Sequence, residues 1–232
     1  LSSSFKLNKD VFGFPIQWIP KNPRWQNYVD IWTQIPLLTF VKNTVKITVV
    51  VTLLQLFTSS FAAYAFAKMQ FKGKTALFLG YIATIAVPWQ AYMVPQFMMM
   101  SSWHLNNTHL AIMCLQAFSA FGVFLMKQFY EGVPTELCEA ARIDGLSEYG
   151  IWWHIMLPLS LPALSTLTIF TFVNTWNDFL GPLIYLTKTE LKTIQIGLRM
   201  FITQYSAEYG LIMAASVVAL IPVLIVFLSL QK

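Results

Sequence analysis

EAARIDGLSEYGIWWHIMLP, residues 139–158, belongs to the most charged part of a very apolar chain. Five of the ten acidic residues of the chain lie between positions 131 and 148, and long uncharged runs lie on both sides. A charged segment between two apolar runs is typical of a water-facing loop between two membrane spans. The stretch therefore predicts a membrane protein with a polar loop at this point.

Two short helices joined by a turn are predicted within this loop. Gly145 can adopt the left-handed conformation that ends a helix, and Ser147 can cap the next one. Glu139 and Arg142 are three residues apart and can form an ion pair on one helix face. Small side chains on a short exposed helix allow a partner to approach closely, as in helices that bind in a groove. An ordinary amphipathic loop would give the same pattern.

The fixed positions of the stretch are EAA-x-x-DG, then nine residues, then I-x-LP. They resemble the EAA signature of permease subunits of bacterial ATP-binding-cassette (ABC) importers. Three further segments resemble this family in the expected order: AYAFAKMQFKG at 63–73, WNDFLGPL at 176–183 and TIQIGL at 193–198. Together they resemble the MalG-type subunit of carbohydrate importers.

The resemblance implies that loop 131–158 is cytoplasmic and holds a coupling helix, which docks in a groove of a separate ATPase subunit. Carried over by position, the docking residues would be Glu139, Ala140, Ala141, Arg142, Asp144 and Gly145.

Composition points to the same class of protein. The 232 residues are 56% hydrophobic and only 11% charged, which is too apolar for a soluble domain and typical of a polytopic membrane protein. The net charge of +5 is modest and no basic cluster suggests nucleic acid. The two cysteines lack metal-ligand spacing and the three histidines are scattered, so no metal site is expected.

Apolar runs long enough to cross the bilayer predict an all-α fold with five transmembrane helices. The expected spans are residues 43–67, 75–100, 109–130, 159–186 and 209–231. Pro88 and Pro95 are expected to kink the second span. The division would be an extracytoplasmic loop segment, 1–42, followed by a transmembrane permease domain, 43–232. The resemblance implies one more span before residue 1, which would make six spans in the intact subunit. The orientation in the membrane also rests on the resemblance, because the distribution of lysine and arginine does not decide which side is cytoplasmic.

Asp178 is the single formal charge between Glu148 and Lys188. An acid within a span is costly and usually faces a cavity or a partner. The candidate substrate-pathway residues are Asn174, Trp176, Asn177, Asp178, Gln90 and Gln116. Amide and carboxyl groups can bind sugar hydroxyls, and an indole ring can cover the C–H face of a sugar. Helix packing is the alternative role for each of them.

The resemblance implies a permease subunit that moves a sugar or oligosaccharide inward by alternating access across the bacterial cytoplasmic membrane. Its implied partners are a second, non-identical permease, two ATP-binding subunits, an extracytoplasmic solute-binding protein, the sugar and membrane lipid. ATP and magnesium would be bound by the ATPase subunits. This chain lacks the G-x-x-x-x-G-K-[ST] phosphate loop, so neither a cofactor nor a catalytic residue is expected in it.

Two alternatives remain open from the sequence. One is an ABC permease for a non-sugar solute, such as an amino acid, a polyamine or phosphate. The other is an intramembrane enzyme, which needs catalytic residues that converge in the membrane. Asp178 alone does not meet that requirement.

Overall fold

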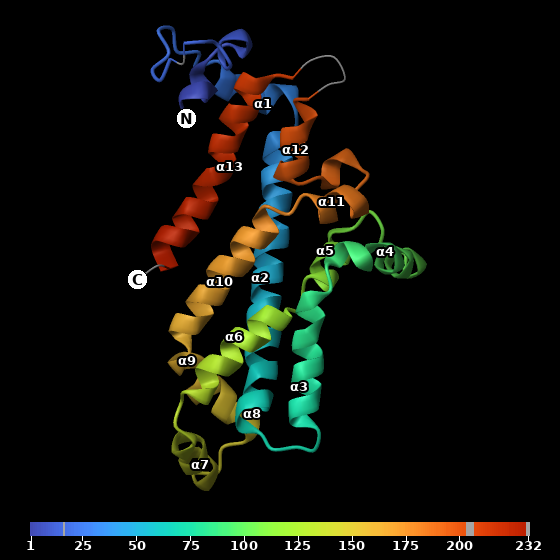
Figure 1. Ribbon diagram of the computed structural model, residues 1–232, viewed down its shortest axis with the longest axis vertical. Coiled ribbons are helices and arrows are strands. Elements are labelled where there is room, and N and C mark those ends of the chain that lie inside the picture. The colour runs from blue at the N-terminus through green and yellow to red at the C-terminus, as the bar shows by residue number, and fades with distance from the viewer. Residues whose placement is uncertain (16, 203–206, 231–232) are drawn as a thin grey trace.

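The long helix α2, Leu37–Lys68, is the element around which the others are arranged (Figure 1). The computed structural model describes residues 1–15, 17–202 and 207–230. With 32 residues, α2 is about 48 Å long, which exceeds the ~30 Å hydrocarbon thickness of a bilayer. Side chains from its start, middle and end each enter a different buried apolar cluster. Because α2 contributes to all three clusters, it connects one end of the molecule to the other.

The other helices and turns surround α2. Before it lie η1 Ser2–Phe5, η2 Asn8–Asp10 and α1 Asn27–Gln34. The first half after it contains α3 Lys74–Ala83, η3 Thr84–Ala86, η4 Trp89–Ala91, α4 Met93–Ser102, α5 His109–Leu115, α6 Ala120–Glu131 and α7 Thr135–Ile143. The second half contains α8 Glu148–Ile151, η5 Trp152–Met156, α9 Leu157–Leu159, α10 Leu161–Trp176, α11 Leu180–Tyr185, η6 Thr189–Leu191, α12 Ile194–Met200 and α13 Tyr209–Leu230.

The described residues form helices and turns, with no named strand, so the predicted all-α class is confirmed. Within the described ranges, two helices, α2 and α13, are long and apolar enough to cross a membrane alone. Two bent pairs, α5 with α6 and the segment α8–α9 with α10, raise the number to four if each pair is one span. The bends are 43° and 80°. The shorter apolar helix Lys74–Ala86 corresponds to the remaining predicted span.

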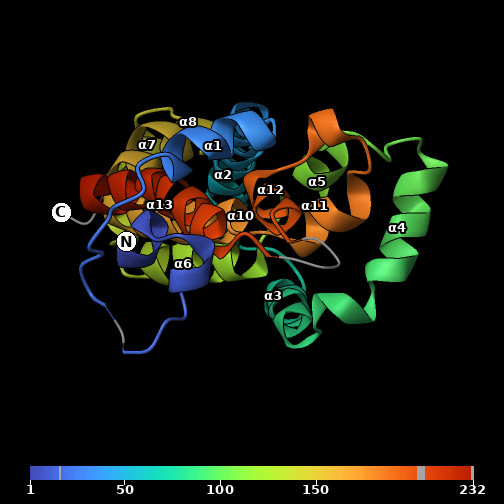
Figure 2. The same cartoon turned by 90° about the horizontal axis from the view of Figure 1, so that it is seen from above.

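The predicted second span differs most from the structure. Val87 and Pro88 are extended and separate α3 and η3 from α4, which lies at the edge of the molecule (Figure 2). This break follows from the proline ring, which disfavours helical backbone at the residue before it. Pro95 was expected to kink this span, but it does not lie in the interior of a helix. It lies in the first turn of α4, where the backbone N–H groups lack intrahelical partners in any case.

The last predicted span, 209–231, corresponds to α13, and its final residue, Gln231, lies outside the described residues. α13 packs against α10 and α1. α6 and α10 both pack along α2. These contacts build the bundle at whose two ends the loop helices lie.

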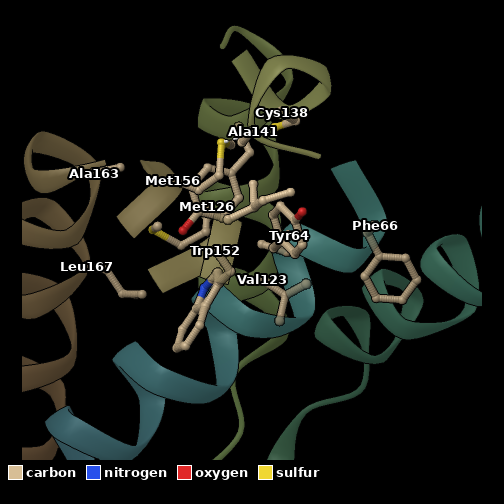
Figure 3. Close-up of a cluster of buried hydrophobic side chains, with 13 residues drawn as sticks. Tyr64, Phe66, Val123, Met126, Cys138, Ala141, Trp152, Met156, Ala163 and Leu167 are labelled. Carbon is tan, nitrogen blue, oxygen red and sulfur yellow. Dashed lines mark hydrogen bonds between the residues drawn. The ribbon is translucent and has the colours of Figure 1, made fainter. Parts of the chain in front are cut away.

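One buried cluster ties the loop helices to the bundle (Figure 3). It joins Tyr64 of α2 and Met126 of α6 to Trp152 of η5. Cys138 and Ala141 close it from the side of α7. The charged loop is therefore packed on the end of α2.

Candidate functional site

The helix α7 is bounded as the sequence predicts. Gly145 has φ = +87°, the left-handed conformation that favours glycine. The N–H of Leu146 donates to Ala141 O (3.0 Å) and that of Gly145 to Arg142 O (3.0 Å), which together form a Schellman motif. Ser147 Oγ then accepts from the N–H of Gly150 and caps α8. Both predicted helix boundaries are confirmed.

The outer face of α7 is open to solvent. Glu139, Ala140, Asp144 and Gly145 are all exposed. Ala141 differs from them, because it is only 4% exposed and packs inward with Cys138. Burial raises the pKa of the Cys138 thiol, which therefore stays protonated at neutral pH. Of the predicted docking residues, Ala141 thus secures the helix to the bundle.

Ile143 is a surface residue of α7 that the sequence analysis missed. It is 86% exposed, an unusual position for a large apolar side chain. The signal was present in the sequence, because Ile143 lies three residues after Ala140 and so shares its helix face. The exposed surface of α7 therefore combines acidic groups, a small side chain and the apolar side chain of Ile143.

Arg142 does not pair with Glu139, which corrects the ion pair expected from their spacing. Its Nε and Nη2 atoms donate to the two carboxylate oxygens of Glu148, at 2.7 and 3.2 Å. This hydrogen-bonded pairing raises the pKa of the Arg142 guanidinium further above its usual value. The reason is tertiary, since the turn at Gly145 brings the start of α8 beside the end of α7.

A second candidate site is a cavity of about 610 Å³ in the bundle. It lies between α2, the break between α5 and α6, α10, and the segment from η4 to α4. Its polar lining residues are Gln55, Gln96, Gln116, Ser119, Thr171, Asn174, Thr175 and Asp178. Its aromatic lining residues are Trp89, Tyr92, Phe118, Phe121, Phe170 and Tyr185.

The break between α5 and α6 forms one wall of this cavity. A broken helix frees carbonyl groups, which must find partners at membrane depth. Gln55 Nε2 of α2 donates to Gln116 O at 2.7 Å, and Thr58 Oγ1 donates to Ala117 O at 2.8 Å. Side chains of α2 therefore replace the helix bonds that the break removes.

Asp178 lies at the centre of a hydrogen-bonded chain in the cavity. Gln116 Nε2 donates to Asp178 Oδ2 (2.7 Å), while the N–H of Gly181 donates to Asp178 Oδ1 (3.1 Å). Thr175 Oγ1 donates to Gln116 Oε1 at 3.2 Å. Groups from two segments thus hold the carboxyl group in one orientation, and Thr175 in turn holds Gln116.

The predicted pathway residues do not all meet. Gln116, Asn174 and Asp178 line the cavity. Trp176 does not, since it is 1% exposed and donates through Nε1 to Ala219 O of α13 (2.9 Å). Asn177 accepts a bond from Gln195, and Gln90 is exposed on η4; neither lines the cavity.

Gln55 and Thr171 belong to the cavity but were not selected from the sequence. Thr171 Oγ1 donates to Gln55 Oε1 at 2.9 Å. Gln55 is the sole amide side chain between residues 47 and 67, and that isolation in an apolar run was the available signal. Its partners come from α5–α6 and α10, so its role required the tertiary structure.

The chemistry of the cavity is polar but carries almost no charge. Among its described lining residues are amides, hydroxyls, aromatic rings and one carboxyl group, and none is Lys, Arg or His. Within the described part of the chain, no group of three or more His, Cys, Asp or Glu is placed to hold a metal ion. The arrangement fits an uncharged ligand with many hydroxyl groups.

Comparison with known proteins covers the whole chain. Residues 55–232 match the family model described as "Binding-protein-dependent transport system inner membrane component". The arabinooligosaccharides transport system permease protein AraQ of Halalkalibacterium halodurans is 36% identical over 233 residues, covering 99% of this chain and 84% of that protein. The lactose transport system permease protein LacG of Rhizobium radiobacter is 35% identical over 208 residues, covering 90% of this chain and 76% of that protein.

A solved structure has the same fold. A chain of a bacterial ABC transporter involved in the import of the acidic polysaccharide alginate superposes with a TM-score of 0.88 and 24% identity. The match covers 100% of this chain and 87% of that chain. At 24% identity, this similarity shows a shared fold and nothing more specific.

Proposed function

Because the chain belongs to the family of binding-protein-dependent transport system inner membrane components, we propose that it forms part of the path of an uncharged sugar or oligosaccharide. It is the permease component of an ABC importer, and not an enzyme. The solute would cross a bacterial cytoplasmic membrane by alternating access. The observation that carries this proposal is the cavity beside α2, with its amide, hydroxyl and aromatic lining.

The lining suits a sugar in two ways. Gln116 and Asn174 present amide groups to the cavity, and these can exchange hydrogen bonds with sugar hydroxyls. Phe118 and Phe170 present aromatic rings, whose apolar faces can cover sugar C–H groups. A permease named for arabinooligosaccharide transport and one named for lactose transport are 36% and 35% identical to this chain, which supports the same solute class.

The charge of the cavity favours a neutral solute over an acidic one. A carboxylate group that leaves water without a counter-charge pays a large desolvation cost. None of the described lining residues is basic, and Asp178 would repel an anion when ionised. A uronate or sulfonated sugar would therefore meet a higher barrier here than a neutral glycoside of the same size.

The exposed face of α7 is the proposed docking surface for the ATPase subunit. Glu139, Ala140, Ile143 and Asp144 are all exposed there. The small Ala140 side chain lets a partner groove approach the helix, and Ile143 would be covered by it. A second permease subunit and an extracytoplasmic binding protein complete the proposed assembly, with ATP and magnesium held by the ATPase subunits.

Uptake by whole cells tests the proposal. Cells that lack the chromosomal copy of this subunit would be supplied with labelled sugars, either with the wild-type gene restored or without it. Neutral oligosaccharides and size-matched uronates would be compared, each with and without depletion of cellular ATP. Wild-type cells are expected to take up at least one neutral sugar in an ATP-dependent manner, and uronates poorly.

Each contrary result points to a different function. Uptake of neutral sugars that persists without this subunit or without ATP would overturn the importer assignment for those sugars. Uronate uptake that equals neutral-sugar uptake would overturn the charge argument. Competition by amino acids, polyamines or phosphate, without competition by sugars, would identify a non-sugar permease.

A further inference from the structure

We propose that Tyr64, Glu148 and Arg142 form a hydrogen-bonded linkage that transmits movement of α7 to the central helix α2. The linkage would make Tyr64 and Glu148 positioning residues for transport. This inference rests on the proposed function, in which α7 binds the ATPase subunit.

The linkage begins in the last turns of α2. Tyr64 is only 2% exposed, and its hydroxyl donates to Oε2 of Glu148. The same carboxylate accepts two bonds from Arg142, through Nε and Nη2. Glu148 therefore joins a residue of α2 to a residue of α7 through bonds that are strengthened by charge.

The other end of α7 is attached to α2 as well. Lys68, the last residue of α2, donates through Nζ to the backbone carbonyl of Val133, just before α7 begins. Between these two attachments, Cys138 and Ala141 are buried in the same cluster as Tyr64 (Figure 3). With both ends and the inner face held, α7 and the end of α2 should move together.

α2 leads from this attachment to the cavity. Gln55 lies nine residues before Tyr64 on the same uninterrupted helix, a rise of about 14 Å. There, Gln55 and Thr58 hold the carbonyl groups of Gln116 and Ala117 at the break between α5 and α6. A displacement of α7 would therefore reach the cavity wall through one rigid element.

Stability alone explains this arrangement poorly. The side chains of Arg142 and Glu148 are 36% and 37% exposed, and ion pairs that solvent screens to this degree contribute little to folding. The ion pair should instead act by fixing positions, because it holds the end of α7 against Glu148, whose carboxylate also accepts from Tyr64. Removal of the linkage is thus expected to loosen coupling while the fold and the assembly persist.

The test compares transport with ATP hydrolysis in the same vesicles. The complete transporter, purified with its partner subunits, would be reconstituted with Tyr64→Phe, which removes only the hydroxyl. The matched control is Tyr149→Phe, a change at the neighbour of Glu148 that is 69% exposed. Loss of one bond to a charged group should lower solute uptake per ATP hydrolysed by about tenfold in Tyr64→Phe. The control should keep the wild-type ratio.

A double variant tests whether the residues act together. If Tyr64→Phe and Glu148→Gln break the same linkage, their combination should be no worse than the more severe single variant. Additive losses, or a wild-type ratio in Tyr64→Phe, would overturn the linkage. Should Tyr64→Phe fail to accumulate in membranes, Glu148→Gln alone provides the same test, because Glu148 lies outside the proposed docking residues and accepts from both Tyr64 and Arg142.

The experiment separates the two proposals. A wild-type complex without ATP-dependent uptake would overturn the proposed function. A wild-type complex that couples normally, together with linkage variants that do the same, would overturn the linkage alone.

Discussion

Gly122 of α6 lies so close to Ser59 of α2 that a Cβ atom at position 122 would sit 3.1 Å from Ser59 Cβ and closer still to its hydroxyl. Small residues at such a crossing allow two membrane helices to approach closely. The same Cβ would also lie 3.2 Å from Leu167 Cδ1 of α10. Gly122 is therefore a point of close approach between α2, α6 and α10.

Gly122→Ala should destabilise the protein, because the added methyl group forces α6 away from α2. Overpacking of this kind typically costs about 1–3 kcal/mol. The measurement is the midpoint of thermal unfolding in detergent. Gly80→Ala on α3 is the matched control, since a Cβ there meets nothing within 4 Å and alanine favours helix. Equal midpoints for the two variants would contradict the close packing.

Gln55→Leu should lower the stability of the protein, because the carbonyl of Gln116, at the break between α5 and α6, loses its hydrogen-bond donor. An unsatisfied buried acceptor costs about 1–3 kcal/mol. Gln90→Leu, at an exposed position, controls for the added apolar surface and should change the unfolding midpoint little. A midpoint for Gln55→Leu at or above that of the wild type would show that another group satisfies this carbonyl.

Cysteine labelling can locate the docking face of α7. In a Cys114→Ser background, Ala140→Cys should react quickly with a maleimide, because position 140 is exposed. Cys138 provides an internal control two residues away, since it is 0% exposed and its pKa is raised by burial. Addition of the ATPase subunit should protect position 140. Labelling that is unchanged by a bound ATPase would place the docking surface elsewhere.

Substitutions at Gly145 separate backbone strain from loss of surface chemistry. A Cβ atom at position 145 would have no neighbour within 4 Å, so there is space for a side chain, but φ = +87° requires the left-handed conformation. Asparagine tolerates that conformation and valine does not. Gly145→Val should therefore lose ATPase co-purification, whereas Gly145→Asn should retain most of it. Equal loss in both variants would mean that the ATPase contacts position 145 directly.

A charge reversal at Glu139 tests the same surface without altering the backbone. Glu139 is exposed, and the ion pair of Arg142 is made with Glu148 instead. Glu139→Lys should therefore insert normally and abolish uptake by weakening ATPase docking. Normal uptake by this variant would contradict a docking role for Glu139.

Local features were predictable because they depend on neighbours in the sequence. The end of α7 at Gly145 and the cap of α8 by Ser147 follow from backbone conformation and side-chain reach within a few residues. The apolar runs that became α2 and α13 follow from length and composition. The match between residues 55–232 and the transport family also agrees with the resemblance found in the EAA stretch.

Contacts between distant residues were not predictable in the same way. Gln55 binds the carbonyl of Gln116, which lies 61 positions away, and Trp176 points to α13 rather than to the cavity. A helix such as α13 is apolar almost throughout, so no amphipathic pattern indicates which face turns inward. The same limit applied to Arg142: helical spacing predicted a pair with Glu139, but the turn at Gly145 places Glu148 beside Arg142.

By itself, the sequence determined the helical class, the membrane setting, the end of α7 at Gly145, the cap of α8 by Ser147 and the family to which the chain belongs. Only the tertiary structure decided that Ala141 faces inward while Ile143 faces outward, and that Tyr64 and Arg142 share Glu148. It also decided that one cavity unites Gln55, Gln116 and Asp178. The physical reason is that helix ends and membrane spans depend on local backbone geometry and hydrophobicity, whereas side-chain partners depend on how whole helices pack.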